Sequence, residues 1–278
     1  MFETVKKLIR EVFDYKKDIL HRIRINKRVT KLFGCQYRVN RKFINIITTY
    51  KCNLLCYDCS QNCRQAPSGE KMTAGQVNRF VRESIKNNIH YQTIFITGGE
   101  SLIEKNIFEI FNILIKYRNK YSLNTKIILI TNGYGKLIKE QIKKVPSTII
   151  IRNTNKTSNY SSRFFSINIA PKDFKEYKDV DFRNGCYILQ GCGMSLTKYG
   201  YYACPNMGAI DRVVGLNIGR KTFLKSNDKM RDQMNKLCRY CGLFLYKGYK
   251  GNDRNKQSKT YKKLFKKYKL KKPNLTDY

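Results

Sequence analysis

The chain has 278 residues, of which 41% are hydrophobic, so it can bury a substantial core without the help of disulfides. Lysine and arginine together number 56 against 20 aspartate and glutamate residues, which gives a formal net charge of +36 at pH 7. This composition excludes a disordered tail and a disulfide-dependent mini-protein, and it admits either an anionic partner or a surface solvated by lysine.

Residues 1–42 are predicted to form a basic, amphipathic helical extension. Apolar residues recur at helical spacing from Phe2 to Ile23, between charged residues, and lead into a basic stretch from Arg22 to Arg28. Such a helix either packs on the main domain or binds a membrane surface or a partner protein.

Residues 43–178 are predicted to form an α/β domain, because short runs rich in Ile, Phe and Thr alternate with helical segments. The expected strands cover residues 43–48, 93–97, 126–131, 148–152 and 164–169, and the expected helices cover residues 74–88, 103–119 and 135–144. This alternation favours parallel βαβ units that close partly into a barrel. In such barrels the chemistry lies at the carboxyl ends of the strands.

The first expected strand is followed directly by Cys52, Cys56 and Cys59, in a C-x3-C-x2-C arrangement. Three thiolates on one loop can each bind one iron of a cubane [4Fe-4S] cluster, which leaves the fourth iron open. Cys63 could supply a fourth ligand, so a zinc ion or a four-cysteine cluster remains an alternative.

The second expected strand ends in Gly98-Gly99-Glu100. Two glycines let the backbone approach a ligand closely, and the glutamate can accept hydrogen bonds from an ammonium group. Together with the cysteine loop after the preceding strand, this motif resembles the radical S-adenosylmethionine (SAM) superfamily, and the resemblance covers about residues 43–171.

The resemblance implies a partial (β/α)6 barrel in which the three cysteines bind the cluster and SAM chelates the open iron. Gly98, Gly99 and Glu100 would then hold the SAM amino group, and Asn132 of a Thr-Asn-Gly turn would line the SAM pocket. By the same logic, Arg152 and Asn168 at the ends of the next two strands point toward SAM or substrate. The sequence departs from the family pattern at Asp58, where a bulky residue is usual, and at Ser101, where proline is common.

Residues 179–245 contain a second set of cysteines and resemble the SPASM and twitch domains, which carry auxiliary iron-sulfur clusters. The resemblance rests on the segment from Gly200 to Cys204 and on a distal C-x2-C pair. It implies one auxiliary [4Fe-4S] cluster, with ligands Cys186, Cys204, Cys238 and Cys241. Cys192 is then an alternate ligand, a structural cysteine or a catalytic hydrogen-atom donor, and a structural zinc remains an alternative to the cluster.

Residues 246–278 are rich in lysine and tyrosine, and we expect a basic tail that is partly helical or disordered. The sequence shows no secretory signal and no run of about 18 apolar residues, so we expect a cytoplasmic protein without a transmembrane segment. In that reducing compartment, ten cysteines indicate metal binding. Only His21 and His90 are present, and neither lies beside a cysteine cluster, which argues against His-rich zinc and Ser-His-Asp chemistry.

The resemblance implies reductive cleavage of SAM to a 5′-deoxyadenosyl radical, which abstracts a substrate hydrogen. With an auxiliary cluster as electron acceptor, the expected outcome is oxidation or another modification of a sugar-like or cyclitol-like molecule or of a ribosomal peptide. A flavodoxin- or ferredoxin-type protein would supply electrons, and the positive charge allows an anionic substrate. The alternatives are an epimerase that uses Cys192, an RNA-modifying enzyme, and a non-catalytic iron-sulfur carrier, against which the Gly-Gly-Glu motif argues.

Overall fold

The computed structural model describes residues 2–158, 167–245 and 257–278, and it is built around a six-stranded sheet. The strand order is β4-β3-β2-β1-β5-β6, and all neighbours are parallel except the antiparallel hairpin β5-β6. The strands are β1 (Phe43–Ile47), β2 (Thr93–Thr97), β3 (Lys126–Thr131), β4 (Ile150–Asn153), β5 (Met194–Thr197) and β6 (Gly200–Tyr202). The predicted α/β class with a parallel-rich sheet is confirmed.

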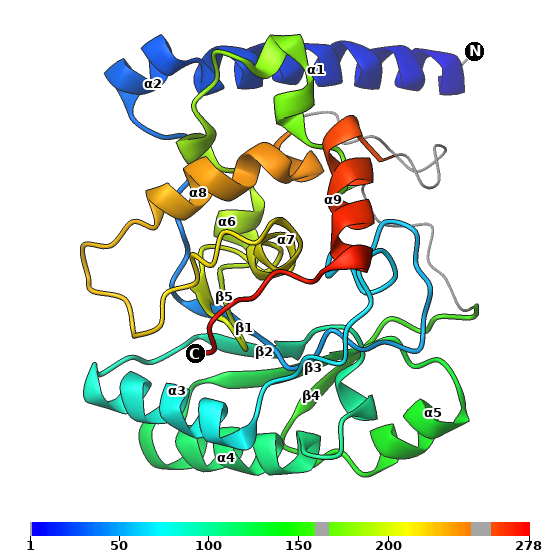
Figure 1. Cartoon of the computed structure of the whole chain (residues 1–278), viewed down its shortest axis with the longest axis vertical. Coiled ribbons are helices and arrows are strands. Elements are labelled where there is room, and N and C mark those ends of the chain that lie inside the picture. The colour runs from blue at the N-terminus through cyan, green and yellow to red at the C-terminus, as the bar shows by residue number, and fades with distance from the viewer. Residues whose placement is uncertain (1, 159–166, 246–256) are drawn as a thin grey trace.

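Three helices cover one face of the sheet (Figure 1). They are α3 (Ala74–Lys86), α4 (Ile107–Tyr121) and α5 (Lys136–Lys143), close to the ranges predicted from the sequence. Helix α3 begins with a capping box between Thr73 and Gln76, which satisfies two backbone donors at its N-terminus. Its buried Val77 and Phe80 belong to the same core as Ile44 and the other isoleucines of the strands. This burial provides the hydrophobic stabilisation that holds the βαβ units together.

The fifth predicted strand, residues 164–169, is not borne out where it can be followed. Residues 164–166 lie outside the described residues, and residues 167–169 form a turn followed by irregular backbone. The sheet instead grows at its other edge, where β5 pairs in parallel with β1. The hairpin β5-β6 belongs to the segment predicted as a separate auxiliary domain, so that segment and the barrel share one sheet.

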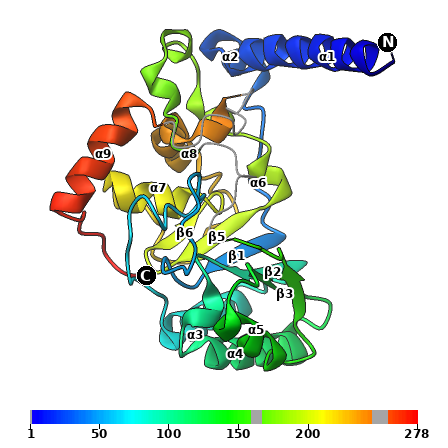
Figure 2. The same ribbon diagram turned by 90° about the vertical axis from the view of Figure 1, so that its right-hand side faces the viewer.

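The remaining elements of that segment lie on the side of the sheet away from α3 and α4 (Figure 2). The α-helices are α6 (Ile188–Gly191), α7 (Met207–Val214) and α8 (Arg231–Leu237). Short 3-10 helices occur both in this segment and before it: η1 (Ser101–Ile103), η2 (Pro171–Asp173), η3 (Lys175–Tyr177), η4 (Phe182–Asn184), η5 (Cys238–Tyr240) and η6 (Gly242–Phe244).

The described part of the C-terminal segment, predicted as a basic tail that is partly helical or disordered, contains a helix that packs into the fold. Helix α9 (Lys259–Leu270) buries Tyr261, Phe265 and Tyr268, which are spaced at i, i+4 and i+7. The last residue, Tyr278, donates its hydroxyl hydrogen to Glu83 of α3 at 2.8 Å. The high lysine content made this amphipathic pattern hard to recognise in the sequence. Three aromatic side chains nevertheless suffice to bury one face of a short helix.

The predicted N-terminal helix forms as α1 (Phe2–Ile25) and is followed by α2 (Lys27–Phe33). Both lie along one outer edge of the molecule (Figures 1 and 2). No helix within the described residues has both the length and the apolar character needed to span a bilayer.

Candidate active site

The loop after β1 carries the first cysteine set. Cys56 is buried, and Cys52 and Cys59 are half-buried. The backbone N–H of Leu54 donates to Cys52 Sγ at 3.4 Å. A hydrogen bond from Cys63 lowers the pKa of Cys59, and the same contact together with burial raises the pKa of Cys63. Cys63 therefore lies beside Cys59, one of the predicted ligands.

Gly98 and Gly99 lie against the backbone that leads into this cysteine loop. Gly98 has a φ of +148°, and a Cβ atom there would lie 2.5 Å from the carbonyl oxygen of Thr49. A Cβ atom on Gly99 would lie 2.1 Å from the carbonyl oxygen of Lys51. The backbone N–H of Gly99 donates to Thr49 at 2.8 Å, and that of Glu100 donates to Lys51 at 2.9 Å. In this structure the glycines allow two backbone segments to meet closely.

The Glu100 side chain joins the end of β2 to the turn after β3. It is fully buried, and its carboxylate accepts hydrogen bonds from the Thr131 hydroxyl at 3.0 Å and from the backbone N–H of Asn132 at 2.8 Å. It also accepts from the backbone N–H of Leu102 at 3.2 Å. Burial raises the pKa of this carboxyl group, and these hydrogen bonds oppose the rise.

Asn132 connects that turn to the cysteine loop. Its side-chain amide donates to Asn53 Oδ1 at 2.8 Å and lies 3.9 Å from Cys52 Sγ. The side chain of Asn53 in turn donates to the carbonyl oxygen of Tyr134 at 2.8 Å. The cysteine loop, the Gly-Gly-Glu segment and the Thr-Asn-Gly turn thus meet at the carboxyl ends of β1, β2 and β3, as the sequence predicts for a barrel site.

Replacing Glu100 with glutamine is expected to weaken both this junction and SAM binding. One carboxylate oxygen becomes an NH2 group that faces N–H and O–H donors, so at least one buried hydrogen bond is lost, at a cost of about 1–3 kcal/mol. We expect a lower Tm and less 5′-deoxyadenosine at low SAM concentration, with the iron content retained. Unchanged product formation at low SAM would show that Glu100 does not contribute to SAM binding.

Arg152 lies on the face of the sheet opposite α3 and α4. Its guanidinium lies over the ring of Phe95, with its central carbon 5.6 Å from the ring centroid. Arg152 and Ile150 are exposed and Phe95 is half-buried, so this inner face remains partly open within the described residues. The position is consistent with the predicted orientation of Arg152 toward a ligand.

Asn168 does not lie at the end of a strand, contrary to the sequence-based expectation. It is buried in a turn, and its carbonyl oxygen accepts a hydrogen bond from the backbone N–H of Ser258 at 3.1 Å, just before α9. The apolar run that predicted a strand also suits a buried segment beneath a helix, since periodicity does not distinguish the two.

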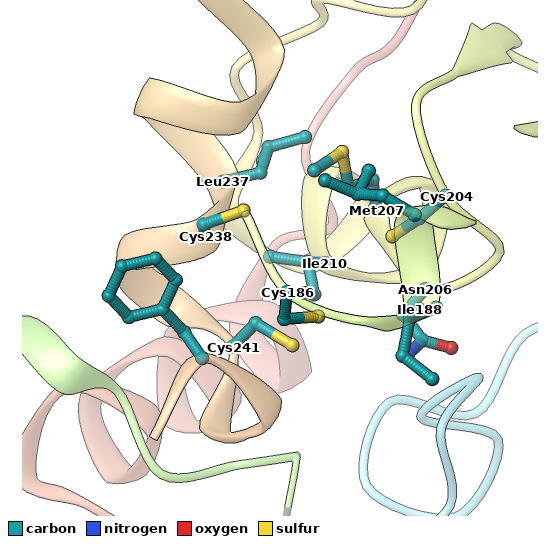
Figure 3. A pocket seen from close by; sticks show the side chains of 11 residues that line it. Cys186, Ile188, Cys204, Asn206, Met207, Ile210, Leu237, Cys238 and Cys241 are labelled. Carbon is teal, nitrogen blue, oxygen red and sulfur yellow. The ribbon is translucent and has the colours of Figure 1, made fainter. Parts of the chain in front are cut away.

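Four cysteines of the second set line one pocket (Figure 3). Their sulfur atoms turn toward the same space, and they come from three places in the chain: Cys186 before α6, Cys204 after β6, and Cys238 and Cys241 after α8. The other lining residues are mostly apolar, among them Met207, Ile210, Leu237 and Phe244. Burial raises the pKa of Cys204 to about 11 and that of Cys241 to about 12. Four converging thiols in an apolar shell fit the donor set of a [4Fe-4S] cluster.

Cys192 is not among the described residues that line this pocket. It is half-buried, and its carbonyl oxygen accepts a hydrogen bond from the Asn45 side chain on β1 at 2.7 Å. Of the two upstream cysteines, Cys186 therefore occupies the position expected of a ligand. Within the described residues, no three His, Cys, Asp or Glu side chains are placed closely enough to bind a single metal ion.

Arg212 on α7 is a functional candidate that sequence reasoning missed. It is 1% exposed, and its guanidinium donates to the carbonyl oxygens of Ala66 at 2.8 Å and Gln61 at 3.2 Å, in the segment that follows the first cysteines. It also donates to the Tyr268 hydroxyl of α9 and lies over the ring of Tyr50, 4.2 Å from the centroid. The adjacent charges Asp211 and Arg212 between the apolar residues 209–210 and 213–214 were the available signal.

Comparison with known families identifies the part of the chain that carries the first site. Residues 46–148 match the profile described as the Radical SAM superfamily. The matched segment contains the cysteine loop, the Gly-Gly-Glu segment and the Thr-Asn-Gly turn.

Two proteins of similar sequence carry names that refer to the same reaction. The "Probable GTP 3′,8-cyclase" of Methanococcus maripaludis (strain C5) is 33% identical over 90 residues, which cover 32% of this chain and 30% of that protein. The "GTP 3′,8-cyclase" of Desulforamulus reducens is 33% identical over 102 residues, which cover 35% of this chain and 29% of that protein. The alignments thus span less than a third of these relatives.

The fold is similar to that of a solved structure over a longer range. The crystal structure of BtrN in complex with AdoMet and 2-DOIA aligns with a TM-score of 0.50 and 14% sequence identity. The alignment covers 77% of this chain and 99% of the BtrN chain. The likeness extends beyond the segment matched by the family profile and concerns the fold.

Proposed function

The chain carries a radical SAM domain in residues 46–148, and we propose that it is an enzyme that cleaves SAM reductively and modifies its substrate by hydrogen abstraction. The observation that carries this proposal is the hydrogen-bonded junction at the carboxyl ends of β1, β2 and β3. There Asn132 contacts the cysteine loop, and its backbone is held by Glu100.

Cys52, Cys56 and Cys59 would hold the SAM-binding [4Fe-4S] cluster, and Gly98, Gly99 and Glu100 would lie beside the SAM amino group. Bound there, the cluster and SAM supply the electron and the 5′-deoxyadenosyl radical. Cys56 is buried and Cys52 and Cys59 are half-buried, and three thiolates on one loop can each bind one iron of a cluster. The surrounding core, including fully buried Ile46 and Ile96, would limit access of water to the reaction.

Cys186, Cys204, Cys238 and Cys241 would hold an auxiliary [4Fe-4S] cluster. Four protein ligands leave no open iron for substrate, so electron transfer is the role that this donor set favours. We therefore favour an oxidative outcome on a sugar-like or cyclitol-like molecule or a ribosomal peptide. Arg152, exposed on the inner face of the sheet, would bind an anionic group of such a substrate.

The packing of α9 weakens the case for an RNA-modifying enzyme. In the described part of the C-terminal segment, Tyr261, Phe265 and Tyr268 could have stacked on bases, but they are buried in the fold, as is Tyr278; Tyr246 and Tyr249 lie outside the described residues. The positive charge remains compatible with an anionic small substrate and with docking of an acidic flavodoxin- or ferredoxin-type electron donor. We place this chemistry in the cytoplasm, where thiols stay reduced.

The proposal is tested on the anaerobically reconstituted full chain. With two filled sites it should contain about eight irons, and with dithionite and SAM it should release 5′-deoxyadenosine and methionine. A sample that fills both sites and forms no 5′-deoxyadenosine would contradict the enzyme proposal. Bound zinc beside a single cluster would contradict the auxiliary cluster.

Once a substrate is found, the same assay in deuterated water separates oxidation from epimerisation. An exchangeable thiol such as Cys192 would deliver solvent deuterium to the product carbon, whereas an oxidation would not. We expect no deuterium in the product of the parent enzyme. We also expect an unimpaired product yield from Cys192→Ala. Deuterium incorporation that this substitution abolishes would favour the epimerase.

A further inference from the structure

The apolar face of α1 points away from the body of the protein. Five large side chains at helical spacing are exposed by 40–62% of their area: Val12, Tyr15, Ile19, Leu20 and Ile23. We call them the outer apolar face. Isolated exposed apolar residues are common on protein surfaces, but a periodic stripe along one helix marks a binding surface.

The opposite side of α1 fixes this orientation. His21 is buried, and its Nε2 atom lies 3.0 Å from the carbonyl oxygen of Phe244. Ile25 is also buried, and its carbonyl oxygen accepts a hydrogen bond from the backbone N–H of Asp181 at 2.7 Å. Rotation of the helix to bury the outer apolar face would break both contacts.

Basic side chains accompany the outer apolar face. Lys16, Lys17 and Arg22 on α1 are exposed, as are Lys27, Arg28 and Lys31 on or beside α2. Helix α2 adds two highly exposed apolar residues, Leu32 and Phe33. Asp18 lies toward the inner side, with its side chain only 13% exposed and paired with Arg22 at 3.0 Å. The surface therefore combines apolar and cationic groups.

We propose that α1 docks on an anionic lipid bilayer, with its axis in the plane of the surface and its outer apolar face inserted between the headgroups. Helix α1 lies along an outer edge of the molecule (Figures 1 and 2), so its side can approach a flat surface. Lysine and arginine side chains can extend to lipid phosphates while the apolar side chains enter the acyl boundary. A second copy of the chain is a poor occupant, because each copy carries a net charge of +36.

The test measures co-sedimentation of the full chain with two kinds of vesicle. One kind is pure phosphatidylcholine, and the other contains about one third phosphatidylglycerol. We expect binding to the anionic vesicles that weakens as salt increases, and little binding to the neutral ones. The pair Leu20→Glu and Ile23→Glu should lower the affinity for anionic vesicles at least about tenfold, because it removes apolar insertion and adds repulsion.

A matched control changes the charge equally at exposed apolar residues elsewhere. Leu123 and Leu270 are exposed by 77% and 81%, and their double replacement by glutamate should change the affinity less than about twofold. Equal losses for the two pairs would reduce the effect to net charge and overturn the proposal. A parent chain that fails to bind anionic vesicles at low salt would also overturn it. So would a parent dimer that the α1 pair converts to monomer, because the face would then bind a second copy.

Discussion

Replacing Cys52, Cys56 and Cys59 together with alanine is expected to abolish formation of 5′-deoxyadenosine and to remove about half of the bound iron. The three thiols are the only protein ligands that we assign to the first cluster, and alanine offers iron no donor. The second set of cysteines comes from three other segments, around the pocket lined by Ile210 and Phe244. That set should keep its cluster.

The expected result has a spectroscopic form. The triple variant should retain the broad absorbance of one [4Fe-4S] cluster and about four irons, whereas the parent should contain about eight. The matched control is Cys63→Ala, which removes the thiol hydrogen-bonded to Cys59 but none of the assigned ligands. We expect this control to keep both clusters and SAM cleavage. Loss of the first cluster in Cys63→Ala would instead identify a site with four cysteine ligands, and SAM cleavage by the triple variant would refute the assignment.

The sequence predicts which segments form the first candidate site, because its motifs are local. Cys52, Cys56 and Cys59 lie within one loop, and the two other motifs each follow a strand. Parallel pairing of β1, β2 and β3 then brings the three strand ends together whatever the details of the helices. Spacing and strand order therefore suffice to predict that these three segments meet.

The less local parts of the structure could not be derived in this way. Gly98 and Gly99 face the backbone of Thr49 and Lys51, a contact between the ends of β1 and β2, which the whole β1-α3-β2 crossover separates. The pairing of β5 with β1 joins residues about 150 positions apart, and a strand of four residues carries no signal of its partner. The packing of Asn168 under the segment before α9 depends on the same kind of distant contact.

Arg212→Leu is expected to destabilise the whole protein and to loosen the first cysteine loop. The leucine leaves the carbonyl oxygens of Ala66 and Gln61 without their charged donor inside the fold. Buried acceptors that lose a charged partner cost about 3 kcal/mol in total, which corresponds to a fall in Tm of about 8 °C for a chain of this size. The segment held by Arg212 follows Cys59 directly, so we also expect the first cluster to be lost more readily to a chelator.

The Arg212 prediction depends on geometry as well as on charge, and two further variants separate these contributions. Arg212→Lys keeps the cation but cannot donate to Ala66, Gln61 and Tyr268 from one planar group, so it should fall between the parent and the leucine variant. Arg118→Leu is the matched control, because the half-buried Arg118 donates to the carbonyl oxygen of Thr148 away from both cysteine sets. Its Tm should change by about 2 °C or less.

Helix α7 also lines the second pocket through Met207 and Ile210, so Arg212 connects the two cysteine sites mechanically. If Arg212→Leu accelerates chelation of the first cluster alone, its main effect is on the cysteine loop, whereas equal acceleration at both clusters would assign it a general role in the core. Iron release as rapid as in Arg118→Leu would refute any role in holding the loop.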